Sequence, residues 1–116
     1  MTKEYLSAYV DNLKPKINVA NVNFTIPDGG YTRFVTATGA NAEITLPALA
    51  NSIGAIYYIT AENIGGLTIK CNAGDFDILN RGVTYDTFTI DDGSDDGAAV
   101  QIINNGINYI LFQLTP

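Results

Sequence analysis

Acidic side chains are the residues in this chain best suited to do chemistry. The stretch from residue 91 to residue 97 holds four of the twelve acids, namely Asp91, Asp92, Asp95 and Asp96. Carboxylates in a glycine-containing loop are ligands that calcium prefers, so this stretch is a candidate ligand or cation loop. Its spacing departs from the EF-hand pattern, because Gly93 stands at a ligand position. A solvated loop that discourages edge pairing is the competing interpretation, and we assign no metal site.

A second acidic pair, Asp75 and Asp77, flanks Phe76. Paired carboxylates are the minimum apparatus of a glycoside hydrolase, whereas Asp residues next to glycine are typical of turns. The chain has no His, and Cys71 is its single Cys. These two facts exclude Ser-His-Asp and Cys-His catalysis, His/Cys zinc sites and internal disulfides. We therefore expect a protein without enzymatic activity and without a cofactor, in which Cys71 is a small buried apolar residue.

Tyrosines offer a further kind of site. An aromatic surface for a glycan or a protein would draw on five of them, namely Tyr31, Tyr57, Tyr58, Tyr85 and Tyr109. The alternative is that most of these rings lie in the core or at a subunit interface, with their hydroxyls reaching solvent.

Length and charge narrow the class of protein. With 116 residues the chain has room for one compact domain. Its net charge of −6 argues against nucleic acid as a partner, because such binders cluster Lys and Arg. No apolar run approaches the roughly 20 residues of a membrane span, so no membrane partner is expected. The first residues lack the apolar region of a signal peptide, which predicts synthesis in the cytoplasm.

Residues 2–13 have the periodicity of a helix. An apolar stripe recurs at i, i+1, i+4, i+5 and i+8, formed by Tyr5, Leu6, Tyr9, Val10 and Leu13. Pro15 then ends the helix. A free helix of this length is marginal in water, so the stripe must dock on something. We predict two parts, with residues 1–16 as an anchor helix and linker and residues 17–116 as the body.

The body has the two-residue period of strands. Ile, Thr, Asn and Gly are abundant, which favours strands joined by turns. Residues 31–37 and 42–46 are predicted to form a hairpin, and Leu49 and Ile53 to plug one end of the core. Asn105-Gly106 predicts a two-residue type I′ turn. Eight or so short strands at this spacing predict an all-β fold, an antiparallel β-sandwich or small barrel with a short N-terminal helix.

The final strand, residues 107–114, is apolar on both faces. One face carries Tyr109 and Leu111, and the other carries Ile110, Phe112 and Leu114. Such a strand lies either between two layers of a core or against another subunit, and sequence alone does not separate these cases. We predict an oligomer interface that includes Tyr109 and Leu111, with the opposite face as the alternative.

Between Tyr31 and Leu114 a series of short motifs follows in a set order and spacing. The motifs are Val35-Thr36-Ala37, Ala42-Glu43-Ile44-Thr45-Leu46-Pro47, Gly54, Tyr57-Tyr58-Ile59, Asn63, Leu67-Thr68-Ile69, Gly74-Asp75, Ile78, Gly82, Gly106 and Tyr109-Ile110-Leu111. By their order and spacing this part of the chain resembles a β-module of bacteriophage fibres, tail-tip adhesins and head fibres.

This resemblance implies a structural or adhesive protein, without catalysis and usually trimeric, whose N-terminus anchors it to the virion. We therefore expect a head fibre or capsid decoration protein on the capsid exterior, made in the host cytoplasm. Its partners would be capsid or other virion proteins and two further copies of itself. The alternative function is a receptor- or glycan-binding tip module of a tail fibre, which would contact a host surface glycan.

Overall fold

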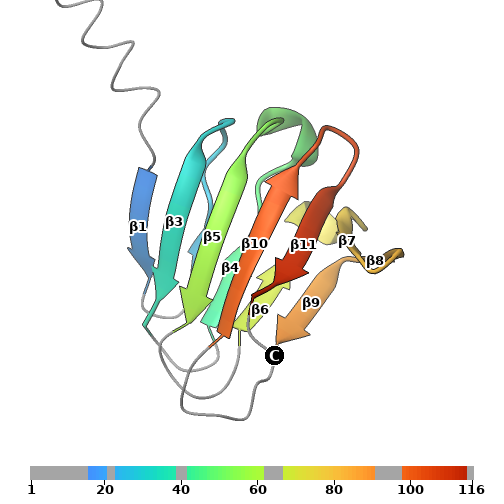
Figure 1. The fold of residues 1–116 in the computed structure, drawn as a ribbon. Coiled ribbons are helices and arrows are strands. Elements are labelled where there is room, and N and C mark those ends of the chain that lie inside the picture. Colours follow the sequence, from blue (N-terminus) through green and yellow to red (C-terminus); the bar gives the residue numbers. More distant parts are fainter. Residues whose placement is uncertain (1–15, 21–22, 39–41, 62–66, 91–97, 115–116) are drawn as a thin grey trace, which may run out of the picture.

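The protein folds into two mixed β-sheets that lie one in front of the other (Figure 1). The computed structural model describes residues 16–20, 23–38, 42–61, 67–90 and 98–114. The predicted helix of residues 2–13 lies outside them. The seven-stranded sheet has the order β1 (Lys16–Ala20), β3 (Thr32–Ala37), β5 (Ile56–Ala61), β10 (Ala98–Asn104), β11 (Tyr109–Gln113), β7 (Ile78–Asn80) and β8 (Val83–Tyr85). The four-stranded sheet has the order β2 (Asn23–Thr25), β4 (Ala42–Thr45), β6 (Leu67–Lys70) and β9 (Thr87–Ile90).

The first six strands wind as a coil, because successive strands alternate between the two sheets. Within the seven-stranded sheet, β1 pairs with β3 and β3 pairs with β5, all in parallel. In the four-stranded sheet β2, β4 and β6 are likewise parallel neighbours. The strand in the opposite sheet serves as the crossover that parallel pairing requires. The all-β prediction is confirmed, but antiparallel pairing was wrong for this half of the chain, and residues 31–46 form no hairpin.

The last strands close the coil with mostly antiparallel pairs. Strand β10 lies between β5 and β11 and is antiparallel to both, and β9 is antiparallel to β6. Strands β7 and β8 pair with each other at the edge next to β11. Two short 3₁₀ turns, Leu49–Asn51 and Asn72–Gly74, lie in the connections. In the described part of the chain, no helix has the length and apolarity to cross a membrane.

A short internal repeat marks the coil. Phe24-Thr25-Ile26-Pro27 and Ile44-Thr45-Leu46-Pro47 have the same pattern, and Phe24 pairs with Ile44 while Thr25 pairs with Thr45. The ladder continues beyond the strands, because the Ile26 N–H donates to the Thr45 carbonyl oxygen at 2.9 Å. Consecutive turns of the coil therefore place equivalent residues in register.

One apolar core fills the space between the sheets. Alternate residues of each long strand point inward, and the fully buried side chains come from both sheets: Val35, Ile59, Val100 and Ile102 from one, Ile44, Leu67 and Ile69 from the other. Cys71 is buried and unpaired, as predicted. Leu49 packs against this core, but the predicted plug Ile53 is 58% exposed. The Ile53 carbonyl oxygen lies against Gly30, where a Cβ would come within 2.6 Å of it.

The loop between β10 and β11 differs from the predicted two-residue turn. Asn104 pairs with Tyr109, so residues 105–108 form a four-residue connection. Gly106 has a positive φ of 89°, and Asn105 does not share it, which excludes a type I′ turn. The Asn105 side-chain oxygen instead accepts the N–H groups of Ile107 and Asn108, at 2.9 and 2.8 Å. This side-chain bonding takes the place of the tight backbone turn.

The parallel register of β3 and β5 predicts a specific cross-link. Thr36 and Thr60 are paired, and their hydroxyl oxygens are 3.5 Å apart. A Thr36→Cys/Thr60→Cys variant should form a disulfide on mild oxidation, seen as a loss of 2 Da by intact mass spectrometry. The control, Thr36→Cys/Thr89→Cys, places its thiols on different sheets and should remain reduced. A disulfide in both variants, or in neither, would contradict the register.

Candidate functional site

The acidic candidates are not assembled into a site by the described residues. Asp91, Asp92, Asp95 and Asp96 lie outside them, as do Tyr5, Leu6, Tyr9, Val10 and Leu13. Asp75 and Asp77 follow the 3₁₀ turn Asn72–Gly74. Partial burial and the neighbouring Asp75 raise the pKa of Asp77. Among the described residues no group of three or more His, Cys, Asp or Glu is placed to hold a metal ion.

Asp77 acts through its backbone rather than through its carboxylate. Its carbonyl oxygen accepts the Tyr109 N–H at 2.7 Å and the Asn108 side-chain amide at 3.4 Å. These bonds hold the start of β11 against the residue that precedes β7. These contacts favour the interpretation of Asp75 and Asp77 as turn-forming residues over a glycoside hydrolase centre.

The tyrosines are divided among separate environments. Tyr57 and Tyr109 are buried in the core with ring centroids 6.2 Å apart. Tyr85 packs edge-on against Phe88 near the sheet edge, with centroids 5.1 Å apart. Tyr58 lies on the outer surface of the seven-stranded sheet. Because Tyr57 and Tyr109 are buried, the five tyrosines do not form one contact surface, and Tyr57 is not accessible to a glycan.

A buried polar cluster closes the end of the core where the β4–β5 and β10–β11 loops meet. The Tyr109 hydroxyl donates to the Pro47 carbonyl oxygen at 2.7 Å and lies 2.7 Å from the Ser52 hydroxyl. The Ser52 hydroxyl also donates to the Ala48 carbonyl oxygen at 3.2 Å. Tyr57 approaches Ser52 but makes no hydrogen bond of ordinary geometry. The loop after β4 is thereby fastened to the final strand.

Asn104 fastens the same loop from β10. Its side-chain amide donates to the Leu49 carbonyl oxygen at 2.9 Å and to the Ser52 hydroxyl at 3.3 Å. Its side-chain oxygen accepts the Gly106 N–H at 2.9 Å. Asn104 is not among the predicted site residues, although alternation with the inward-facing Val100 and Ile102 indicates that it is buried.

The contacts of this cluster favour a structural role. Burial raises the pKa of Tyr109 far above its ordinary value, and burial also raises the pKa of Tyr57. Ser52 is hydrogen-bonded to neutral partners, and no base contacts it among the described residues. A nucleophilic serine needs such a base, so these contacts favour holding the loops in place over acid–base chemistry.

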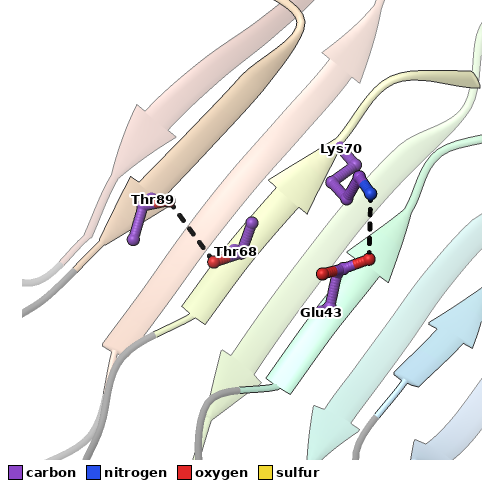
Figure 2. A network of polar contacts seen from close by, with 4 residues as sticks. All are labelled: Glu43, Thr68, Lys70 and Thr89. Carbon is purple, nitrogen blue, oxygen red and sulfur yellow. Dashed lines mark hydrogen bonds and ion pairs between the residues drawn. The ribbon is translucent and has the colours of Figure 1, made fainter. Parts of the chain in front are cut away.

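The outer surface of the four-stranded sheet is polar. Its outward residues form two rows across the strands, which are Asn23, Glu43, Thr68 and Thr89, and Thr25, Thr45, Lys70 and Thr87. Lys70 and Glu43 form an ion pair at 3.1 Å, and the hydroxyls of Thr68 and Thr89 are 3.3 Å apart (Figure 2). Such a surface is well solvated by water.

The outer surface of the seven-stranded sheet carries two largely apolar rows beside the polar pair Thr36 and Thr60, and it is the best candidate for a functional site. One row joins Phe34, Tyr58, Gln101 and Phe112. The next joins Thr32, Ile56, Ile103, Ile110 and Leu79. Phe34 and Phe112 are 43% and 46% exposed, so the described residues leave this surface uncovered. Contiguous exposed apolar surface of this kind marks an interaction site. We call these two rows the apolar face.

The predicted oligomer interface needs a correction. Tyr109 and Leu111 are 1% and 2% exposed within the single chain, because they point into the core between the sheets. They are not available to a partner. The alternative face of the same strand, with Ile110 and Phe112, is the one that lies outward. Phe34 was not predicted as part of this surface, because it is joined to Phe112 only through Tyr58 of β5 and Gln101 of β10, strands far apart in the sequence.

Comparison with protein-family models, curated proteins and solved structures found no match to this chain.

Removing the Tyr109 hydroxyl tests the closing cluster. Tyr109→Phe leaves the buried Pro47 carbonyl oxygen without its donor, and we expect a loss of about 1–3 kcal/mol in the free energy of unfolding. Tyr85→Phe, which removes the hydroxyl of a half-buried ring near the sheet edge, should cost roughly 0.5 kcal/mol or less. Chemical denaturation monitored by circular dichroism measures both. Equal losses in the two variants would contradict the structural role of the cluster.

The buried tyrosines also predict a dependence of stability on alkaline pH. Their pKa values are raised in the folded protein above the ordinary 10.0, so the unfolded chain loses these protons first. The free energy of unfolding should therefore fall as the pH rises above about 10. Tyr109→Phe should show a shallower fall. Thermal melts at a series of pH values measure this slope, and identical slopes for the two proteins would contradict the assignment.

Proposed function

We propose that this chain is a non-catalytic structural protein of a bacteriophage virion, a head fibre or capsid decoration protein on the capsid exterior. Its body is a β-sandwich, preceded by a short N-terminal helix that attaches it to capsid or other virion proteins. Three copies assemble into the functional unit, and the chain is made in the host cytoplasm. It requires no cofactor, metal, nucleic acid or membrane.

The observation that carries this proposal is the contrast between the two outer surfaces. One is polar along both of its rows, and the other presents the apolar face. Exposed Phe34 and Phe112 side chains do not stabilise a monomer in water, whereas a protein that is part of an assembly buries such residues. The buried polar side chains of Asn104 and Tyr109 fasten loops, and this favours a structural role over catalysis.

The strand directions give the two ends of the body different roles. Strand β1 starts at Lys16, level with the start of β3 and with the closed end of the core, because Lys16 pairs with Arg33. An anchor formed by residues 1–15 therefore joins the body at the end closed by the Ser52–Tyr109 cluster. That end would face the virion, and the opposite end would point away from it.

The alternative function, a receptor- or glycan-binding tip, is favoured by one observation. The acidic stretch of residues 91–97 connects Ile90 with Ala98, which pair with Leu67 and Ala61. These neighbours belong to the end opposite Lys16. A ligand loop borne there would be the part farthest from the anchor, where a host surface glycan is reached first.

Attachment through the N-terminal segment predicts the effect of changing its stripe. Leu6→Ser/Val10→Ser removes two apolar docking residues and should lower the number of copies per virion roughly tenfold or more. Lys3→Ser/Asn12→Ser changes two residues outside the stripe and should leave that number unchanged. Quantitative mass spectrometry of purified virions measures it. Unaltered incorporation after the stripe change, or after deletion of residues 2–13, would contradict the anchor.

A further inference from the structure

We propose that the apolar face of the seven-stranded sheet is where one copy of this chain packs against a second copy. The inference rests on the proposed function in that it names the surface through which the assembled unit forms. Its central row is Phe34, Tyr58, Gln101 and Phe112, one residue from each of β3, β5, β10 and β11.

The face is built to exclude water. Phe34 and Tyr58 stack with ring centroids 5.1 Å apart and planes 12° apart, which fixes both rings on the surface. The flanking row adds Ile56, Ile103 and Ile110. The two polar side chains in the centre are bonded to each other, because the Gln101 amide donates to the Tyr58 hydroxyl at 3.2 Å. This bond lowers the cost of burying these two groups when the row is covered.

Charge favours a second copy over a different protein. The chain carries a net charge of −6, so two copies repel each other through charged surfaces. Within the described part of β3, β5, β10 and β11, no outward side chain is charged. The opposite sheet bears Glu43 and Lys70 on its outer surface. The apolar face is thus where like-charged copies approach most closely, and it offers no charge by which a partner of opposite sign would be selected.

The area suits contact between two sheets. Five strands about 4.8 Å apart, and the roughly four residues of about 3.3 Å rise that two outward rows occupy, give a footprint of about 300 Å² per copy. Two copies would bury about 600 Å², which is the size of a weak contact. Sheets that pack face to face do so about 10 Å apart through interdigitating apolar side chains. We therefore expect association that depends on concentration in the micromolar range.

The experiment measures the native mass of the full-length chain by light scattering over a series of concentrations. Wild type should reach two or three times 12.4 kDa. Phe112→Glu places one carboxylate per copy in the centre of the contact and should raise the dissociation constant at least roughly tenfold. Thr89→Glu adds the same charge to the outer surface of the other sheet and should associate like wild type. Circular dichroism melts establish that both variants are folded.

Three results would overturn the inference. One is a wild-type mass of 12.4 kDa throughout the micromolar range. Another is a Phe112→Glu variant that associates as strongly as wild type. If that variant does not fold, the milder Phe34→Ser variant is compared with wild type instead. The third is association that appears only when residues 1–15 are removed, because the chain's own N-terminal segment would then cover the face. Virion incorporation, measured separately, reports on the proposed function, so either can fail alone.

Discussion

The core shared by the two sheets is the constraint on which the rest of the structure depends. Because successive strands alternate between the sheets, each turn of the coil must supply inward side chains from both sides, such as Val35 from β3 and Ile44 from β4. The chain connects two parallel neighbours of one sheet through a strand of the other sheet. The register of the neighbours therefore follows from the equal length of successive turns of the coil. The closing cluster at Tyr109 is needed because the loops at that end carry carbonyl groups, such as those of Pro47 and Leu49, that the core shields from water.

Much of the local structure follows from the sequence, and the pairing of strands does not. The period of two at residues 42–46 and 98–103 locates strands correctly, and the burial of Cys71 follows from the preference of free Cys for buried positions. The alternation of apolar and polar residues, however, predicts which side of a strand is buried. It does not predict which strand lies beside it. The predicted hairpin at residues 31–46 failed because β3 and β4 are consecutive but belong to different sheets. The repeat of Phe24–Pro27 at Ile44–Pro47 is the signal that could have predicted parallel pairing.

The candidate site was harder to predict for the same reason. Tyr109 and Leu111 were chosen because both faces of the last strand are apolar, and only the second sheet decides which face is inside. Phe34, Tyr58 and Phe112 come from three separate strands, and they form one surface only through the order β3, β5, β10 and β11. Chemistry-bearing residues, in contrast, were identified readily by type, yet Asp75, Asp77 and Tyr57 do not gather into a centre.

The proposal that this chain is a structural part of a virion is tested most directly by the protein content of purified particles. Quantitative mass spectrometry, combined with cryo-electron microscopy of the same particles, gives both copy number and position. The account predicts a fixed number of copies per particle and density for the body outside the shell, with the end at Lys16 toward it. Particles that infect normally and contain none of the chain would contradict the account.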